Sequence, residues 1–189
     1  MVSPQYLIKA ILFFGFLFFF VQLSDAQSRS GIGIGLGVNQ PFSSDYNLGG
    51  SIQLQGNIAI GSKLGIVPDI GYDRINSKGG FMHVPNGLSS NKIDDIDLFH
   101  LGLSLRYFFD RHWFAGAGGM FYMAQGKEDT DGIGAGGFGG VGYNLDIDEH
   151  NTLAFSLNTS IVDIVYNGNG VTPIAGLKVA YVVNFKGNR

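Results

Sequence analysis

The chain has 189 residues with 12 basic and 15 acidic side chains, a formal net charge of −3, and no cysteine. This mild balance excludes the basic footprint of a nucleic-acid-binding protein and a polybasic membrane-binding patch. The lack of cysteine excludes a disulfide framework and thiolate chemistry. Only 14% of residues are charged, against about 25% in typical domains, while 30 are glycine and 13% are aromatic. Without a long apolar run after residue 26, this composition favours a transmembrane β-barrel.

Residues 1–26 have the layout of a secretory signal peptide. Lys9 precedes an uncharged apolar run over residues 10–21, and Ser24-Asp25-Ala26 forms an A-x-A-like cleavage site. The alternative is a retained membrane anchor, but this run of 12 residues is short of the roughly 20 that a spanning helix needs. We therefore expect cleavage after Ala26 and one exported β-barrel domain over residues 27–189.

The first segment after the leader, SGIGIGLGVN at residues 30–39, alternates glycine with a large aliphatic residue four times. A helix would spread these residues around its axis, and each interior glycine would cost about 1 kcal/mol relative to alanine. A strand places successive side chains on opposite faces, so one face is aliphatic and the other is glycine. The pattern therefore predicts a strand with an apolar face and a crowded face.

Alternation with period two recurs along the rest of the chain, although the run at 113–125 is ambiguous because glycine and alanine occupy both faces. In that run we assign Phe114, Met120 and Tyr122 to the outer face. The seven further runs are 48–60, 64–73, 99–109, 113–125, 133–145, 153–161 and 177–185. Together with the first, they predict eight strands.

The connections between these runs alternate in length. Short turns surround residues 61–63, 110–112 and 146–151, whereas the other joins, often longer, are polar and cover 39–47, 76–92, 127–131 and 166–170. Short turns at one end and long loops at the other are typical of up-and-down barrels in the outer membrane. We predict an all-β fold, an eight-stranded antiparallel up-and-down transmembrane β-barrel closed by its first and last strands.

The two strand faces carry different residues. Large aliphatics form one face, and the other mixes glycine, alanine and serine with a few polar and charged residues. A soluble lipocalin-like barrel or β-sandwich also alternates, but it puts apolar residues inside and needs more surface charge than this chain has. We therefore expect lipid against the aliphatic face. The predicted polar interior network is Asp69, Asp73, His100, Arg106 and Lys178, and the predicted interfacial aromatics are Tyr72, Tyr107, Phe109, Tyr122, Tyr143, Tyr181 and Phe185.

Charges inside an apolar band are costly unless paired. We expect Arg106 to pair with Asp69 or Asp73 on the neighbouring strand. Lys178 is expected to reach Asn144 or Ser156. Such a network would fill the barrel and oppose a wide aqueous pore. His100 belongs to it as a hydrogen-bonded group; the alternative is a general base aligned by a carboxylate, but no nucleophile is evident at the rim.

The chain resembles the porin-like outer-membrane β-barrel family, the small eight-stranded barrels of the OmpX and OmpA type. The resemblance rests on the leader ending SDAQ, the eight alternating runs over residues 30–186 and the closing strand GLKVAYVVNF. That strand is similar to the family's assembly signal, although residues 186–189 follow Phe185 where many members end on the aromatic. The resemblance implies an outer-membrane location and insertion by the barrel-insertion machinery, and no particular activity.

Three patterns with catalytic or binding potential have simpler interpretations. Overlapping G-x-G-x-x-G matches at 132–142 lack the following helix that a nucleotide site needs. The acidic loop residues do not have the spacing of a twelve-residue calcium-binding loop. These residues are Asp94, Asp95, Asp97, Glu128, Asp129 and Asp131. The longest loop contains hydroxyl, imidazole and carboxyl side chains, including those of His83, Ser89 and Ser90. Their spacing in the sequence does not by itself indicate a catalytic triad. We predict no enzyme, cofactor or metal.

These observations predict an integral outer-membrane β-barrel, a monomer in the lipid bilayer, with a structural or surface-interaction role through its exposed loops. Loops 39–47 and 76–92 would face outward. A narrow channel for small or hydrophobic solutes, with a conductance that depends on Arg106, is the first alternative. An enzyme at the rim that depends on His83 or His100 is the second. The sequence specifies no surface ligand and no nucleic acid partner.

Overall fold

The computed structural model describes residues 29–43, 46–79, 81–84, 87–92, 95–125, 132–163 and 171–185. The expected leader at 1–26 lies outside these residues. Within them the chain forms strands alone. These are β1 (Gly31–Pro41), β2 (Gly49–Ala59), β3 (Leu64–Ile75), β4 (Phe81–Val84), β5 (Gly87–Lys92), β6 (Ile96–Phe108), β7 (Trp113–Gln125), β8 (Gly132–Asp146), β9 (Asn151–Asp163) and β10 (Val171–Asn184). No helix of this described part is long and apolar enough to cross a membrane.

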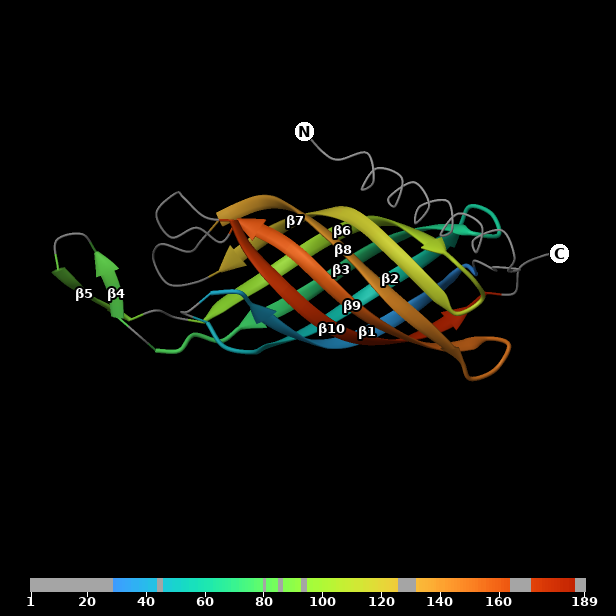
Figure 1. The fold of residues 1–189 in the computed structure, drawn as a ribbon, viewed down its shortest axis with the longest axis horizontal. Coiled ribbons are helices and arrows are strands. Elements are labelled where there is room, and N and C mark those ends of the chain that lie inside the picture. Colours follow the sequence, from blue (N-terminus) through green and yellow to red (C-terminus); the bar gives the residue numbers. More distant parts are fainter. Residues whose placement is uncertain are drawn as a thin grey trace, which may run out of the picture.

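Eight of the strands close into a barrel in the order β1-β10-β9-β8-β7-β6-β3-β2. Every neighbouring pair is antiparallel, and β1 pairs with both β2 and β10, so the closed sheet has no free edge strand. The predicted eight-stranded antiparallel up-and-down barrel is confirmed. The connection from β3 to β6 also contains a separate two-stranded hairpin, β4–β5, which the alternation did not predict. Figure 1 shows this hairpin beyond one end of the barrel.

The two ends of the barrel differ. We call the end with turns 60–63, 109–112 and 147–150 the turn end, and the opposite end, from which the β4–β5 hairpin departs, the loop end (Figure 1). At the turn end, Asp110 accepts the backbone N–H groups of His112 and Trp113 at 2.7 and 2.6 Å. A short carboxylate that bonds the backbone two or three residues onward favours a tight turn. The sequence at these positions therefore specifies reversal of the chain.

The aliphatic residues of β1 face outward and its glycines face inward, as the opening segment predicts. Ile32, Ile34 and Leu36 are exposed on the outer surface of the sheet. A Cβ at Gly33 would meet Val182 of β10, and one at Gly37 would meet Ser51 of β2. Side chains from both neighbouring strands therefore occupy the space in front of β1, and this is why the chain needs glycine there.

The predicted facing of β7 is wrong. Phe114 and Tyr122 are 4% and 3% exposed inside the barrel, and Met120 packs against the interior cluster, whereas Trp113, Phe121 and Met123 point outward. Tyr122 is therefore no interfacial residue. Because glycine and alanine occupy both faces of this run, its sequence does not indicate which face points inward. The facing is set by contacts with β8, where the ring of Phe114 covers Gly142 and the phenol of Tyr122 covers Gly134.

Candidate functional site: the barrel interior

An apolar layer fills the interior near the loop end. Its buried members come from five strands and pack around Tyr122, with Tyr46 and Met120 against them. They are Ile75, Ile96, Leu98, Tyr122, Ala124, Val162 and Ile174. The only polar side-chain group among these seven buried residues is the phenol of Tyr122, and the layer lies between the loop end and the polar groups farther inside.

Below this layer, the imidazole of His100 lies between two carboxylates of β3. Its Nε2 is 3.3 Å from Oδ1 of Asp69, and its Nδ1 is 2.9 Å from Oδ2 of Asp73. The contact between Nδ1 and Asp73 does not have the geometry of a hydrogen bond. Asn39 of β1 donates from Nδ2 to Asp73 at 2.5 Å. Neutral histidine has a single N–H, so both carboxylate contacts are attractive only in the imidazolium form. His100, Asp69 and Asp73 form one cluster, which is ion-paired when the imidazole is protonated.

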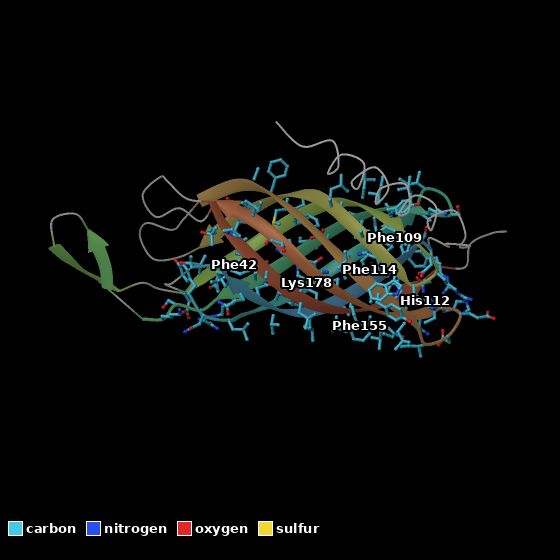
Figure 2. The ribbon with its side chains drawn as sticks, in the orientation of Figure 1. Phe42, Phe109, His112, Phe114, Phe155 and Lys178 are labelled. Carbon is cyan, nitrogen blue, oxygen red and sulfur yellow. The ribbon has the colours of Figure 1, made fainter. Side chains whose placement is uncertain are left out.

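Lys178 of β10 faces the same interior but contacts a different partner from those predicted. Its Nζ donates to Oε1 of Gln53 at 2.8 Å. It was expected to reach Asn144 or Ser156; Ser156 is its backbone partner on β9, yet the ammonium group extends the other way, across β1. The glycine face of β1 leaves room for this contact. Figure 2 shows Lys178 in the middle part of the barrel.

Arg106 also departs from the expected pairing. Among the described residues it forms no ion pair with Asp69 or Asp73, because His100 engages both carboxylates. Its guanidinium instead stacks on Phe114, with Cζ 4.2 Å from the ring centroid. Phe114 in turn packs against Phe108 with ring centroids 5.9 Å apart. These rings form an aromatic layer that separates the polar middle from the turn end.

Between the apolar and aromatic layers lies a cavity of about 100 Å³. Its charged lining residues are the five of the predicted polar network. Neutral amides and hydroxyls complete the polar lining, and among these are Asn39, Gln53, Gln55, Ser104, Ser156 and Asn158. The structure thus brings the network residues together around one cavity, with pairings other than those predicted.

At the turn end of the interior, Asp146 of β8 forms ion pairs with two arginines. Its Oδ1 lies 3.3 Å from Nη1 of Arg29, and its Oδ2 lies 3.4 Å from Nε of Arg111. Thr152 also donates to Asp146, at 3.1 Å, and accepts from Asn184 at 2.8 Å. A second polar cluster therefore lies at this end of the interior.

The outer aromatics lie in pairs near both ends. Tyr72 packs on Phe99 near the loop end, with ring centroids 5.0 Å apart. At the turn end Tyr107 packs on Phe109, and Tyr143 contacts both His112 and Trp113. Tyr181 donates to Asn151, and Phe185 is exposed. Amphipathic rings at such positions suit the two interfaces of a bilayer, and Trp113 was missed because its run was assigned the wrong face.

Neisserial surface protein A and Ail are among the solved structures that share this architecture. Neisserial surface protein A superimposes with a TM-score of 0.55 and 19% identity, over 82% of this chain and 97% of that chain. Ail, the attachment invasion locus protein of Yersinia pestis, gives 0.50 and 9%, over 84% and 99%. The chain has the fold of a small eight-stranded outer-membrane barrel. No family model matches it, and no curated protein matches its sequence.

The loop residues considered for catalysis or calcium fall mostly outside the described part of this outer-membrane barrel fold. These are Asp94, Glu128, Asp129 and Asp131, together with the side chains of His83, Ser89 and Ser90. Asp95 and Asp97 are described, and both contact Arg74, at 2.9 and 3.9 Å. Asp97 also accepts from the hydroxyl of Tyr72 at 2.6 Å. Within the described ranges, no group of three His, Asp or Glu residues could hold a metal ion.

Proposed function

We propose that this protein is an exported, monomeric outer-membrane barrel, inserted by the barrel-insertion machinery, whose role is to anchor and present its loop-end connections at the cell surface. The observation that carries the proposal is the β4–β5 hairpin, which extends the long connection between β3 and β6 past the barrel (Figure 1). Long loops that leave one end of a small barrel are the usual place for its contacts with the surroundings.

The base of this connection is fixed to the barrel by specific contacts. Asp95 pairs with Arg74 at 2.9 Å and accepts the backbone N–H of Ser77 at 2.8 Å. Ser77 forms a β-bridge with Tyr46 of the first connection. The side-chain amide of Asn76 donates to the carbonyl of Leu48 at 2.7 Å. The two connections therefore support each other where they leave the barrel, which suits a presented surface.

The interior supports a surface role over the narrow-channel alternative. The apolar layer around Tyr122, the stacked Arg106 and Phe114, and the cluster around Asp146 each occupy a different level of the barrel. An eight-stranded barrel has an interior just wide enough for side chains to fill. A solute would have to displace all three levels in order to pass.

The proposal is tested by the sidedness of cysteine labelling, since the native chain has no cysteine. Lys78→Cys places a thiol at the loop end and Glu149→Cys places one in a turn at the other end; both positions are exposed. A membrane-impermeant maleimide on intact cells should label Lys78→Cys at once and Glu149→Cys only after the outer membrane is permeabilised.

Labelling of both positions without permeabilisation, or recovery of the protein in the soluble periplasmic fraction, would contradict the membrane location. Purified protein in planar bilayers should give no discrete conductance steps. Steps that change in amplitude in Arg106→Gln would instead favour the channel. Heat-modifiable migration on a denaturing gel establishes that each variant is folded before it is compared.

A further inference from the structure

Arg106 has donors in the barrel interior that no acceptor of the described residues uses. One face of its guanidinium stacks on Phe114 at 4.2 Å. The N–H groups of a guanidinium lie in its plane, so stacking on one face leaves these donors available. Among the described residues the structure shows no hydrogen bond or ion pair from them, and Arg106 lines the cavity. An interior cation without an acceptor is costly unless something else in the cavity supplies one.

Gln55 of β2 presents a second unused donor to the same cavity. The residue is 4% exposed, and its Oε1 accepts from Gln53 at 3.1 Å, but its Nε2 has no partner in the described part of the chain. Asp69 is the backbone partner of Gln55 on β3 and lines the same cavity as Arg106. The carboxylate itself is directed to His100 rather than to either of them. Gln55 therefore also lacks an acceptor.

The net charge of the cavity lining also favours a bound anion. Its charged lining residues are Asp69, Asp73, His100, Arg106 and Lys178. With His100 as the imidazolium that its two carboxylate contacts require, three cations face two anions. Lys178 donates to the neutral amide of Gln53, and among the described residues it forms no ion pair with either carboxylate. The cavity thus has an excess of one positive charge and an excess of hydrogen-bond donors.

We propose that the cavity between the apolar and aromatic layers binds one small monovalent anion, chloride or a short monocarboxylate such as formate, through Arg106 and Gln55. A carboxylate fits the planar edge of a guanidinium, and one negative charge balances the cavity. About 100 Å³ is several times the space that one water molecule needs, so a small anion and some waters fit together. A cation would add to the excess charge and leave both donors unused.

The anion site is independent of the surface role, and it is tested on the full-length protein folded in zwitterionic micelles. Trp113 is the single tryptophan, and its fluorescence reports unfolding on heating. Sodium formate or chloride should raise the unfolding midpoint progressively relative to sodium gluconate of equal ionic strength, because a ligand that binds the folded state alone stabilises it. Gluconate serves as an anion too large for the cavity.

Three variants assign the effect to the site. Arg106→Gln should lose the difference between formate and gluconate, and Gln55→Leu should reduce it. Arg111→Gln, which removes an arginine paired with Asp146 at the turn end, should retain it. If Arg106→Gln does not fold, crystals of the wild-type protein soaked in bromide decide the matter: an anomalous peak beside Arg106 and Gln55 is expected.

Equal unfolding midpoints in formate, chloride and gluconate, with no bromide peak in the cavity, would show that water alone fills it and would overturn the proposal. A salt effect that persists unchanged in Arg106→Gln and Gln55→Leu would overturn it as well, because the effect would then arise elsewhere on the protein.

Discussion

The imidazole of His100 lies directly over Gly71, its backbone partner on the neighbouring strand. A Cβ at position 71 would be 2.5 Å from Cε1 and 2.6 Å from Nε2 of the ring. The absence of a side chain on β3 is thus what allows His100 to lie between Asp69 and Asp73. Gly102 has the same relation to Asp69, whose Oδ2 would be 2.5 Å from an added Cβ.

Gly71→Ala should therefore destabilise the barrel by about 1–3 kcal/mol, the usual cost of overfilling a packed interior. The added methyl group would push the ring of His100 away from the two carboxylates. Unfolding in urea, followed by the fluorescence of Trp113 in lipid vesicles, measures the change. Gly50→Ala is the matched control, because a Cβ there would meet nothing within 4 Å. Equal stability of the two variants would contradict the packing argument.

Leu103→Arg should weaken insertion strongly. Leu103 is 58% exposed on the outer face of β6, midway along the strand, and a charged residue at the bilayer midplane costs about 2–4 kcal/mol. Reversible unfolding from lipid vesicles gives the free energy of folding for the variant and the parent.

The same substitution at Leu64 tests whether depth is the cause. Leu64 is also exposed, but it begins β3 beside a short turn, where a charge costs about 0–1 kcal/mol. Leu64→Arg should therefore fold nearly as well as the parent. If Leu103→Arg inserts and folds like Leu64→Arg, the outer surface of the barrel does not face lipid.

Asp148 should make the last short turn sensitive to acid. The side-chain amide of Asn151, together with the backbone N–H of His150, donates hydrogen bonds to its carboxylate and holds the pKa of Asp148 below its ordinary 3.8. A carboxyl with a lowered pKa in the folded state adds stability that is complete above the unfolded value and disappears as the pH falls through the folded value. The turn should thus weaken below about pH 4.

Heat-modifiable migration between pH 7 and pH 3 tests whether the protein loses stability as the pH falls. Asp148→Ala should lower the unfolding temperature at pH 7 and flatten its decrease toward pH 3 relative to the parent. Glu149→Ala removes the adjacent exposed carboxylate, for which the structure shows no hydrogen bond to a described residue, and should leave the parent profile unchanged. A steeper acid loss in Asp148→Ala would contradict the assignment.

Arg74→Ala should loosen the long connection without unfolding the barrel. The guanidinium pairs with Asp95 at 2.9 Å, but both side chains are partly exposed, so the expected change is only a few-fold. Limited proteolysis of intact cells measures the rate of cleavage within residues 76–95. The control is Arg111→Ala, at the turn end, which should leave that rate as in the parent. Unchanged cleavage in Arg74→Ala would contradict this role of the ion pair and show that the hydrogen bonds of Ser77 and Asn76 are sufficient.

The architecture was predictable because a closed barrel repeats one simple rule, the alternation of side chains across each strand. In β1 large aliphatic residues alternate with glycine over residues 31–38, so the sequence itself assigns its faces. In β7 the run Ala115 to Gly119 carries no such contrast, and only the glycines of β8 decide which rings point inward. This relation depends on the register between strands, which a single sequence does not contain.

The members of the interior network were predictable, but their pairings were not. Asp69, Asp73, His100, Arg106 and Lys178 all line the cavity, because each lies on the polar face of its strand. Which ones meet depends on side-chain reach across the barrel: Lys178 extends over β1 to Gln53, and His100 takes both carboxylates expected for Arg106. Gln53 and Gln55 line the same cavity, and they were not among the residues predicted for the network.

The contact between Lys178 and Gln53 joins β10 to β2 across the glycines of β1. The first strand made and the last strand made must therefore meet before either has its full set of partners. A nascent chain cannot complete β1 until synthesis has passed Asn184, the residue that pairs with Gly31. Such distant pairings form slowly because the chain between them must first be brought together. A chain truncated before β10 would therefore leave β1 and β9 each without one of their neighbouring strands.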